Sequence, residues 1–383
     1  MADASAASVD DALVNEVELL NLEGKVKRTP HGQTQEDFDE WVNEEVAKWP
    51  VTEQYPDLAG RVAGVICGLR KRLFAQGETN TWIRLIKGGR MLKEFSESLP
   101  VVTRVLDYVE RVELGEGEQV TIIDLCSGVG YMSILLAELL AGSPKVARFV
   151  LIDYQFPLLN TPTQPHHINP EHLNKDLFPF ELTHRKYDLK SSSVLRQIQK
   201  HIISRSNGPL VVLGIHLCSI LSIRAVQFYN DNPRCTMLAL KPCCLPPWIL
   251  AQQKYVWTFG GQELAAKDVA GEGKYNKGKW KGPRKETLAP RFKTWAEGLF
   301  AGIDVREGAE EGEAGAKTLE DIKIVHEASN YQTLFAFAER PFKDEDGVVS
   351  DIGGEPLIKP KKKRPSNWNF KKEAERREKK EGA

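Results

Sequence analysis

The sequence predicts an α/β fold with a mainly parallel sheet that follows a helical N-terminal extension. Five short apolar runs between residues 120 and 241 alternate with helix-patterned or irregular segments. Strands that alternate with helices form βαβ units, and such units build parallel sheets. Apolar residues recur at helical spacing before the first of these runs, which indicates that helices precede the sheet. With 383 residues, the chain is long enough for one large α/β domain with an extension and tails.

The N-terminal part divides into two segments. Residues 1–34 are predicted to form a disordered acidic leader, because the first 23 residues hold six acids and no base. Residues 35–115 are expected to form the helical extension, with further helices near 57–76 and 82–112. Its first helix is defined by large apolar side chains at helical spacing before a proline: Phe38, Trp41, Val42, Val46 and Trp49.

The apolar runs predict the strands of the sheet in order. Each is short and is bounded by turn-forming or helix-patterned sequence. The five strands are expected at 120–125, 148–153, 185–188, 209–217 and 235–241, with helices at 133–141 and 191–203. A last pair, 322–326 and 331–339, is separated by a short turn and predicts an antiparallel hairpin at the sheet edge.

Three segments depart from this pattern. Residues 155–181 are rich in proline, are longer than a usual connection and suggest a functional loop. Its histidines, His166, His167 and His172, are expected to be loop residues rather than ligands. Residues 260–316 form a basic and then acidic insertion that resembles a flexible linker. Residues 343–383 form a basic disordered tail, in which 359–383 hold eleven bases against four acids.

Composition excludes several protein classes. Hydrophobic residues make up 41% and charged residues 27%, as in globular proteins rather than fibres or coiled coils. No apolar run reaches the length of a membrane span, and six cysteines in so long a chain indicate reduced thiols. We therefore expect a nuclear or cytoplasmic protein without a membrane contact. The net charge of -1 averages opposed segments, so it does not exclude a nucleic-acid partner.

The strongest motif runs from Asp124 to Ser133, directly after the first predicted strand. Gly128 and Gly130 allow a tight turn and a close approach of the backbone to a ligand at the start of a helix. The second strand ends at Asp153, 23 residues after Gly130, where an acid can accept hydrogen bonds from both ribose hydroxyls. The pattern predicts a nucleotide-type ligand.

Two details favour S-adenosyl-L-methionine (SAM) over a dinucleotide. The third glycine of a dinucleotide fingerprint is replaced by Ser133, and the first strand ends in an acid, Asp124. In this motif the sequence resembles the class I SAM-dependent methyltransferases, whose first motif is Asp/Glu-x-Gly-x-Gly-x-Gly. Cys126 stands where that motif has its first glycine, so we expect its backbone to avoid a strongly positive φ.

The resemblance implies a Rossmann-like seven-stranded class I methyltransferase sheet, within residues 116–342, with strand order 3-2-1-4-5-7-6. It implies SAM as cofactor, and it suggests that Asp188 lies against the adenine amino group. The cofactor-binding residues expected on this basis lie on three strand ends: Asp124, Cys126, Ser127, Gly128, Gly130, Tyr131, Asp153, Tyr154, Asp188 and Leu189.

Two further motifs follow the fourth and fifth strands. His216-Leu-Cys-Ser219 and Lys241-Pro-Cys-Cys are similar to motifs of a subgroup that includes the Trm-type tRNA 2′-O-methyltransferases, although Ser219 replaces the usual glycine. The catalytic candidates are His216 as a general base, Lys241 as an orienting cation, and Cys243 and Cys244 as lining of the transfer pocket. We expect no metal here, because adjacent cysteines seldom both ligate one ion well.

A basic segment indicates the class of substrate. Residues 274–285 hold six bases and no acids, with Tyr275 and Trp280 interleaved, a composition that suits phosphates and exposed bases. The basic tail is a second candidate contact, and its Pro360–Pro365 cluster resembles a nuclear-localisation signal. RNA, either tRNA or rRNA, is the expected substrate. A protein or small-molecule methyltransferase and a non-catalytic RNA-binding protein of the same fold remain alternatives, and the oligomeric state is undetermined.

Overall fold

The computed structural model describes most of the chain between residues 34 and 342. The described residues are 18–20, 26–28, 34–86, 89–158, 178–272, 274–276, 279–305, 316–324 and 332–342. The expectations for the loop histidines, for the basic tail and for most of the leader therefore lie outside the described residues. Within the described residues, no helix combines the length and apolar character that crossing a membrane requires.

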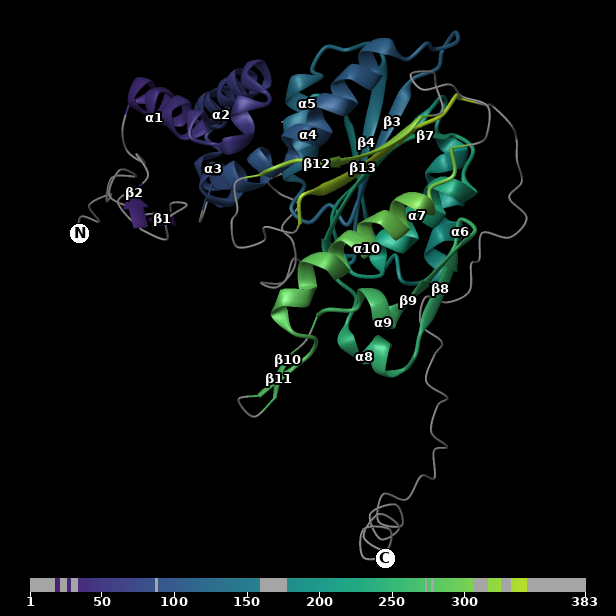
Figure 1. Cartoon of the computed structure of the whole chain (residues 1–383). Coiled ribbons are helices and arrows are strands. Elements are labelled where there is room, and N and C mark those ends of the chain that lie inside the picture. The colour runs from purple at the N-terminus through teal and green to yellow at the C-terminus, as the bar shows by residue number, and fades with distance from the viewer. Residues whose placement is uncertain are drawn as a thin grey trace, which may run out of the picture.

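A seven-stranded sheet forms the centre of the molecule (Figure 1). Its order is β12-β13-β7-β6-β3-β4-β5, in which β13 runs antiparallel to both neighbours and the other internal pairs are parallel. In sequence order this is 3-2-1-4-5-7-6, so the predicted class I methyltransferase topology is confirmed. The strands are β3 (Val120–Leu125), β4 (Val146–Asp153), β5 (Glu181–Lys186), β6 (Leu210–Cys218), β7 (Cys235–Cys244), β12 (Lys317–Asp321) and β13 (Leu334–Glu339).

The terminal hairpin is present, but its first strand differs from the prediction. It was expected at 322–326, whereas β12 ends at Asp321 and pairs with β13 from Lys317. The apolar residues just after β12 produced the error: Ile322 is buried although it lies outside the strand. The half-polar sequence of β12 itself is typical of an edge strand.

Four helices precede the sheet. They are α1 (Gln35–Ala47), α2 (Pro56–Ala75), α3 (Thr79–Ile86) and α4 (Arg90–Arg111), with a short 3-10 turn at Pro50–Glu53. A capping box starts α1: Thr34 Oγ1 accepts from the Asp37 amide, and the Asp37 carboxylate accepts from the Thr34 amide. The segment predicted as one helix at 82–112 is divided in two, with Gly89 at a φ of 67° before α4.

Helices cover both faces of the sheet and create two apolar cores (Figure 1). The N-terminal helices and α5 (Tyr131–Leu139) pack on one face, where Phe149, Leu213 and Phe335 are among the buried sheet residues. On the other face lie α6 (Ser192–His201), α7 (Leu221–Asp231), α8 (Trp248–Gln252) and α10 (Leu288–Ala301). Short 3-10 turns occur at Ile203–Arg205 and Lys285–Thr287.

The segment interpreted as a linker insertion contains ordered structure. Its helix α10 buries Phe292, Trp295 and Leu299 in the second core, so the interpretation is wrong for this part. The apolar residues of α10 were hidden by the glycines, lysines and prolines that precede them. The remaining elements are β8 (Val256–Phe259), β9 (Gln262–Ala265), α9 (Ala266–Val269), the hairpin β10 (Lys274–Asn276) and β11 (Lys279–Lys281), and the distant pair β1 (Glu18–Leu20) and β2 (Val26–Arg28).

Candidate functional site

The loop after β3 turns through three left-handed residues. Cys126, Gly128 and Gly130 have φ values of 57°, 55° and 85°. The expectation that Cys126 avoids a positive φ is therefore wrong. A side chain in this conformation costs about 1–2 kcal/mol relative to the right-handed one. The chain keeps the backbone of a glycine turn at Cys126 despite this cost.

The backbone and side chains of this loop fit an adenosine-containing cofactor. A Cβ at Gly128 would meet no atom within 4 Å, so the backbone is open on that side. The Gly128 amide donates to Asp153 Oδ2 at 3.1 Å, and the Gln155 amide donates to Asp153 Oδ1 at 2.8 Å. Ser127 Oγ is buried with no hydrogen-bond partner among the described residues. Open space, a fixed carboxylate and an unpaired hydroxyl are what a ribose with polar substituents requires.

Both acids of this region are buried. Burial raises the pKa of Asp153, although its two backbone hydrogen bonds oppose the shift. Burial also raises the pKa of Asp124 to about 7, against the hydrogen bond that Ser133 Oγ donates to its Oδ2 at 2.7 Å. The Asp153 charge raises the pKa of Asp124 further. A cationic ligand beside these two acids would relieve this cost by favouring the ionised carboxylates.

The other predicted cofactor residues have different surroundings. The Tyr131 hydroxyl donates to the Leu85 carbonyl at 3.0 Å, which ties α5 to α3. Leu189 is buried, whereas Tyr154 is 59% exposed. Asp188 is exposed, and its Oδ1 accepts from the Lys190 amide at 3.0 Å. The roles assigned to these residues stay predictions.

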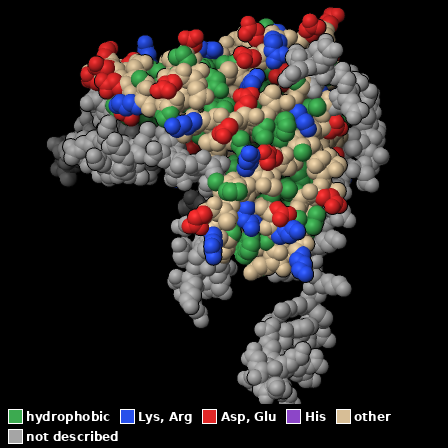
Figure 2. Space-filling model, in the orientation of Figure 1, with side chains coloured by type: hydrophobic (Ala, Val, Ile, Leu, Met, Phe, Trp, Pro, Cys, Tyr) green, Lys and Arg blue, Asp and Glu red, His purple; other side chains and the backbone are tan. Residues whose placement is uncertain are grey.

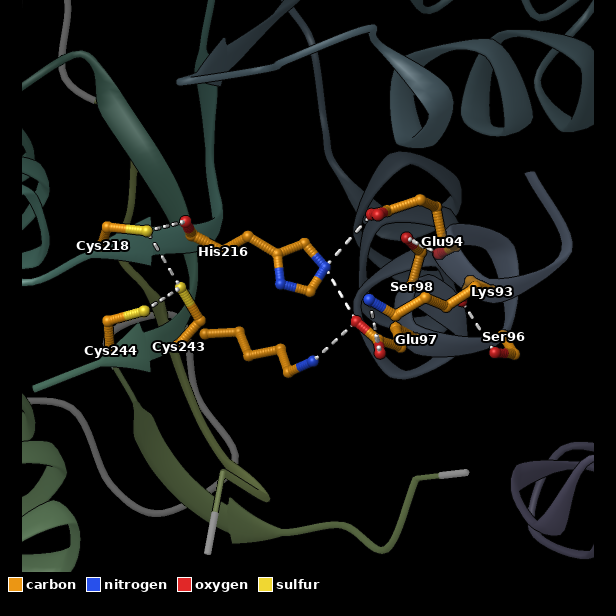
Figure 3. Close-up of polar contacts among 10 residues, drawn as sticks. Lys93, Glu94, Ser96, Glu97, Ser98, His216, Cys218, Cys243 and Cys244 are labelled. Carbon is orange, nitrogen blue, oxygen red and sulfur yellow. Dashed lines mark hydrogen bonds and ion pairs between the residues drawn. The ribbon is translucent and has the colours of Figure 1, made fainter. Parts of the chain in front are cut away.

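Two irregularities at the ends of β6 and β7 arrange the second group of candidates. His216 is an extra residue in β6, because Ile215 pairs with Lys241 and Leu217 pairs with Pro242. His216 also has a φ of 58°. Figure 3 shows its imidazole pointing away from the strand toward α4. A bulge of this kind redirects a side chain that regular alternation would place elsewhere.

Two glutamates of α4 meet His216 there. Its Nε2 lies 2.9 Å from Glu97 Oε2 and 3.2 Å from Glu94 Oε2, at ion-pair distances (Figure 3). The buried Lys241 places its Nζ 3.4 Å from Glu97 Oε2, and Lys93 Nζ lies 3.8 Å from Glu97 Oε1. The structure thus brings two of the catalytic candidates, His216 and Lys241, to the same carboxylate of Glu97. Glu97 is not among the residues that the sequence motifs predicted.

The members of this network shift one another's pKa values. Burial alone would raise the pKa of Glu97, but His216 and Lys241 outweigh it and hold the pKa at about 2. Burial lowers the pKa of Lys241, and Glu97 opposes the shift. Burial disfavours the charged form of His216, but the two glutamates outweigh it and raise its pKa. The two glutamates therefore favour the cationic form of His216, and its assigned role as a general base stays a prediction.

The ion pairs with Glu97 orient the imidazole of His216 and the side chain of Lys241. Methyl transfer from a sulfonium is an in-line displacement, in which orientation of the acceptor supplies much of the rate. Glu97 also has a recognisable signal in the sequence. It lies in the apolar stripe of α4 and is only 4% exposed, and a buried acid requires a partner. Its partner is 119 residues away, so the sequence does not identify it.

The thiols of Cys218, Cys243 and Cys244 converge on the other side of the strand ends (Figure 3). Cys218 Sγ lies 3.4 Å from Cys243 Sγ, which lies 3.5 Å from Cys244 Sγ. The S–H groups of Cys243 and Cys244 stabilise the thiolate of Cys218, so its pKa is lowered and that of Cys243 is raised. The predicted cysteine pair is therefore completed by a third thiol from the His216 motif.

Comparisons with known proteins agree with this picture. A family model described as a methyltransferase domain matches residues 91–246, from α4 to just past β7. No curated protein sequence matches the chain. Because the matched span covers both the cofactor loop and the network around Glu97, it supports one methyltransferase unit that includes α4.

Several solved methyltransferase structures are similar at low identity. The DszA carbon methyltransferase is 14% identical, with 83% of this chain and 73% of that chain covered and a TM-score of 0.33. An O-methyltransferase family protein from Burkholderia thailandensis is 13% identical, with 73% of each chain covered and a TM-score of 0.25. Magnesium protoporphyrin IX methyltransferase from Synechocystis, with bound SAH, is 11% identical, with 72% of this chain and 100% of that chain covered and a TM-score of 0.28.

Likenesses of this size do not establish a shared fold, whereas the strand order does. The sheet has the class I methyltransferase order, and the loop after β3 has the geometry of a cofactor-binding turn. The family match covers the loop after β3 and the parallel strands β3 to β7 of this sheet. Residues 91–246 therefore match a methyltransferase domain, and together with β12 and β13 they build a sheet of the class I methyltransferase order. The chain is a SAM-dependent methyltransferase.

Proposed function

We propose that this SAM-dependent methyltransferase acts on RNA, which the basic hairpin β10–β11 contacts beside the strand ends of the site. The proposal rests on one observation above all: the hairpin is attached at the carboxyl end of β7. The Gly271 amide donates to the Pro246 carbonyl at 3.0 Å, and the Trp248 amide donates to the Glu272 carbonyl at 2.9 Å. The chain leaves the site directly into β10.

The composition of the hairpin suits a polyanion with exposed bases. Within β10 and β11 the register partners are Lys274 with Lys281, Tyr275 with Trp280, and Asn276 with Lys279. The hairpin extends away from the body of the molecule (Figure 1). A projecting arm that combines lysines with paired aromatic residues can neutralise phosphates and stack on bases.

The described residues on the face shown in Figure 2 carry charges of both signs. In Figure 2, Lys and Arg side chains are interspersed with Asp and Glu on the face that is shown. The residues 274–285, with six bases and no acids, are therefore a distinct local concentration of positive charge. A polyanionic acceptor that docks on this arm would approach the site from the β7 side.

The test compares hairpin lysines with matched lysines elsewhere. Binding of fluorescent single-stranded RNA is measured by anisotropy over a salt series for the wild type, for K279Q/K281Q and for the control K71Q/K200Q. Lys71 and Lys200 are exposed on α2 and α6. Loss of two phosphate contacts lowers the slope of log affinity against log salt by about 1.4. The hairpin variant should show this loss, and the control should keep the wild-type slope.

The acceptor is then identified by transfer of labelled methyl groups from SAM to total RNA and total protein fractions. The proposal predicts label in RNA, reduced in K279Q/K281Q. Label in protein or in small molecules, together with equal salt slopes of RNA binding for the two variants, would favour a methyltransferase that acts on protein or on small molecules. RNA binding without any transfer would favour a non-catalytic RNA-binding protein. Either result would overturn the proposal.

A further inference from the structure

Three thiols meet at the carboxyl ends of β6 and β7 because the two strands are irregular there. In a regular strand, Cys243 and Cys244 would point to opposite faces. The register moves from Leu217–Pro242 to Cys218–Cys244, so Cys243 is an extra residue without a partner in β6. This bulge brings both sulfurs of β7 to the same side as Cys218.

The backbone around these thiols is held in an unfavourable conformation. Three of the four non-glycine residues with positive φ among the described residues are Cys126, His216 and Ser219, at this edge of the sheet. Residues in such conformations cost of order 1–3 kcal/mol each and concentrate at functional sites. Ser219 directly follows Cys218, and its amide donates to the Cys244 carbonyl at 3.1 Å. The strained turn thus fixes Cys218 against the end of β7.

We propose that Cys218, Cys243 and Cys244 bind a zinc ion through three thiolates. A tetrahedral zinc with Zn–S bonds of about 2.3 Å holds its sulfurs about 3.8 Å apart. The observed separations are 3.4 and 3.5 Å, and all three sulfurs lie within 4.8 Å of one another. Small side-chain rotations therefore suffice to admit the ion. We expected no metal from the sequence because adjacent cysteines seldom both ligate one ion well, and the bulge at Cys243 lets the two adjacent thiols lie on the same side.

The geometry favours zinc over a disulfide. A disulfide between Cys218 and Cys243 would shorten their separation to about 2.05 Å and leave the third sulfur without a function. Thiolate ligands are what zinc prefers, and three converging thiols supply three of its four positions. Lys190 and His216 lie close enough to favour the thiolate of Cys218. Glu272 lies within electrostatic range of Cys218 and Cys244, and its charge disfavours their thiolates.

The fourth position of this zinc site is open. Cys218 is exposed, whereas Cys243 and Cys244 are partly buried, so the ion would be reached from the side of Cys218. Cys126 of the cofactor loop lies within electrostatic range of Cys218. Three protein ligands with an open position are typical of catalytic rather than structural zinc. The fourth ligand would be water or a donor atom of the methyl acceptor.

Zinc content of the full chain tests the site without use of SAM or RNA, so its outcome is separate from that of the proposed function. The protein is purified under reducing conditions, and zinc is measured by mass spectrometry after gel filtration. The wild type and the control Cys67→Ser, which changes a partly buried thiol on α2, should hold about one zinc per chain. The zinc content of Cys218→Ser and of Cys243→Ser should be at least tenfold lower than that of the wild type.

Cobalt substitution gives a second readout that depends on thiolate ligands. Wild type and Cys67→Ser should show thiolate-to-cobalt charge-transfer absorption, and the two site variants should lose it. Circular dichroism identifies any variant that fails to fold, and the exposed Cys218 is the change least expected to disturb the core. Absence of zinc and of the cobalt signal from the reduced wild type would overturn the proposal. Equal zinc in wild type and in a folded variant lacking all three thiols would also overturn it.

Discussion

The carboxylate of Glu97 is the centre of the network that joins α4 to β6 and β7, so Glu97→Gln tests that network directly. The side chain of Glu97 is 6% exposed, and its pKa is held at about 2 against an ordinary value of 4.5. A shift of this size corresponds to about 3 kcal/mol at neutral pH, as an order of magnitude. Glu97→Gln also leaves the buried Lys241 without its carboxylate partner.

The pH dependence follows from the sign of the shift. Because the pKa of Glu97 is lower in the folded state than in the unfolded state, the contribution of this shift to the free energy of unfolding is complete above pH 4.5. It is lost as pH falls through about 2. At pH 3 less than half of the 3 kcal/mol remains, or about 1.4 kcal/mol. The free-energy difference between wild type and Glu97→Gln should therefore shrink between pH 5 and pH 3.

Urea unfolding followed by tryptophan fluorescence measures this difference. Glu94→Gln is the matched control: Glu94 contacts the same imidazole, but its side chain is 29% exposed, so we expect a loss below about 1 kcal/mol. The double variant Glu97→Gln/Lys241→Met should recover part of the loss, since no buried charge then lacks its partner. A loss below about 1 kcal/mol for Glu97→Gln at pH 7, or a loss independent of pH, would refute the reasoning.

Four further substitutions test other parts of the structure. Since the pKa of Asp124 is raised to about 7 from 3.8, its contribution to stability is complete below pH 3.8 and is lost as pH rises through 7. Between pH 5 and pH 8 this decline is about 3 kcal/mol in the cofactor-free wild type, and Asp124→Asn should abolish it. Urea unfolding at the two pH values measures the difference, and parallel pH profiles for wild type and variant would contradict the reasoning. Gly271→Ala would place a Cβ against Leu245 and should destabilise the protein by about 1–3 kcal/mol. Gly64→Ala lies in helix α2 with open space around it and should stabilise the protein by about 0.5–1 kcal/mol. A thermal unfolding experiment that ranks the two variants in the reverse order would contradict the packing. Lys254→Gly should stabilise the protein by about 1 kcal/mol, because Lys254 is exposed and has a φ of 53° just after α8. An unchanged midpoint of thermal unfolding would argue against backbone strain at this position.

The sequence was sufficient for features that depend on local pattern. Apolar runs followed by acids placed Asp124 and Asp153 at strand ends, because a buried strand must end where polar residues begin. The order of the sheet followed from the resemblance carried by the loop at Gly128 and Gly130. The edge strand β12 was misplaced because its exposure leaves it half polar, so the adjacent apolar residues gave a stronger strand signal.

Features that depend on distant contacts could not be predicted. Glu97 acquires its role only when α4 packs beside the end of β6, and no local pattern pairs it with His216. The convergence of Cys243 and Cys244 depends on a bulge, which the sequence around these residues does not reveal. The left-handed backbone of Cys126 opposes its own residue preference and is imposed by the surrounding turn. Such conflicts between local preference and tertiary structure occur mainly at this site.

The central claim is that the loop after β3 binds SAM, and isothermal titration with SAM and its demethylated product tests it most directly. The wild type should bind both. Asp153→Asn should weaken binding about 10- to 100-fold, because hydrogen bonds to a charged group contribute about 1.5–3 kcal/mol. The exposed Asp304→Asn, at the end of the chain segment after α10, is the control and should bind as the wild type does. A folded wild type that binds neither compound, or an Asp153→Asn variant with unchanged affinity, would contradict the account.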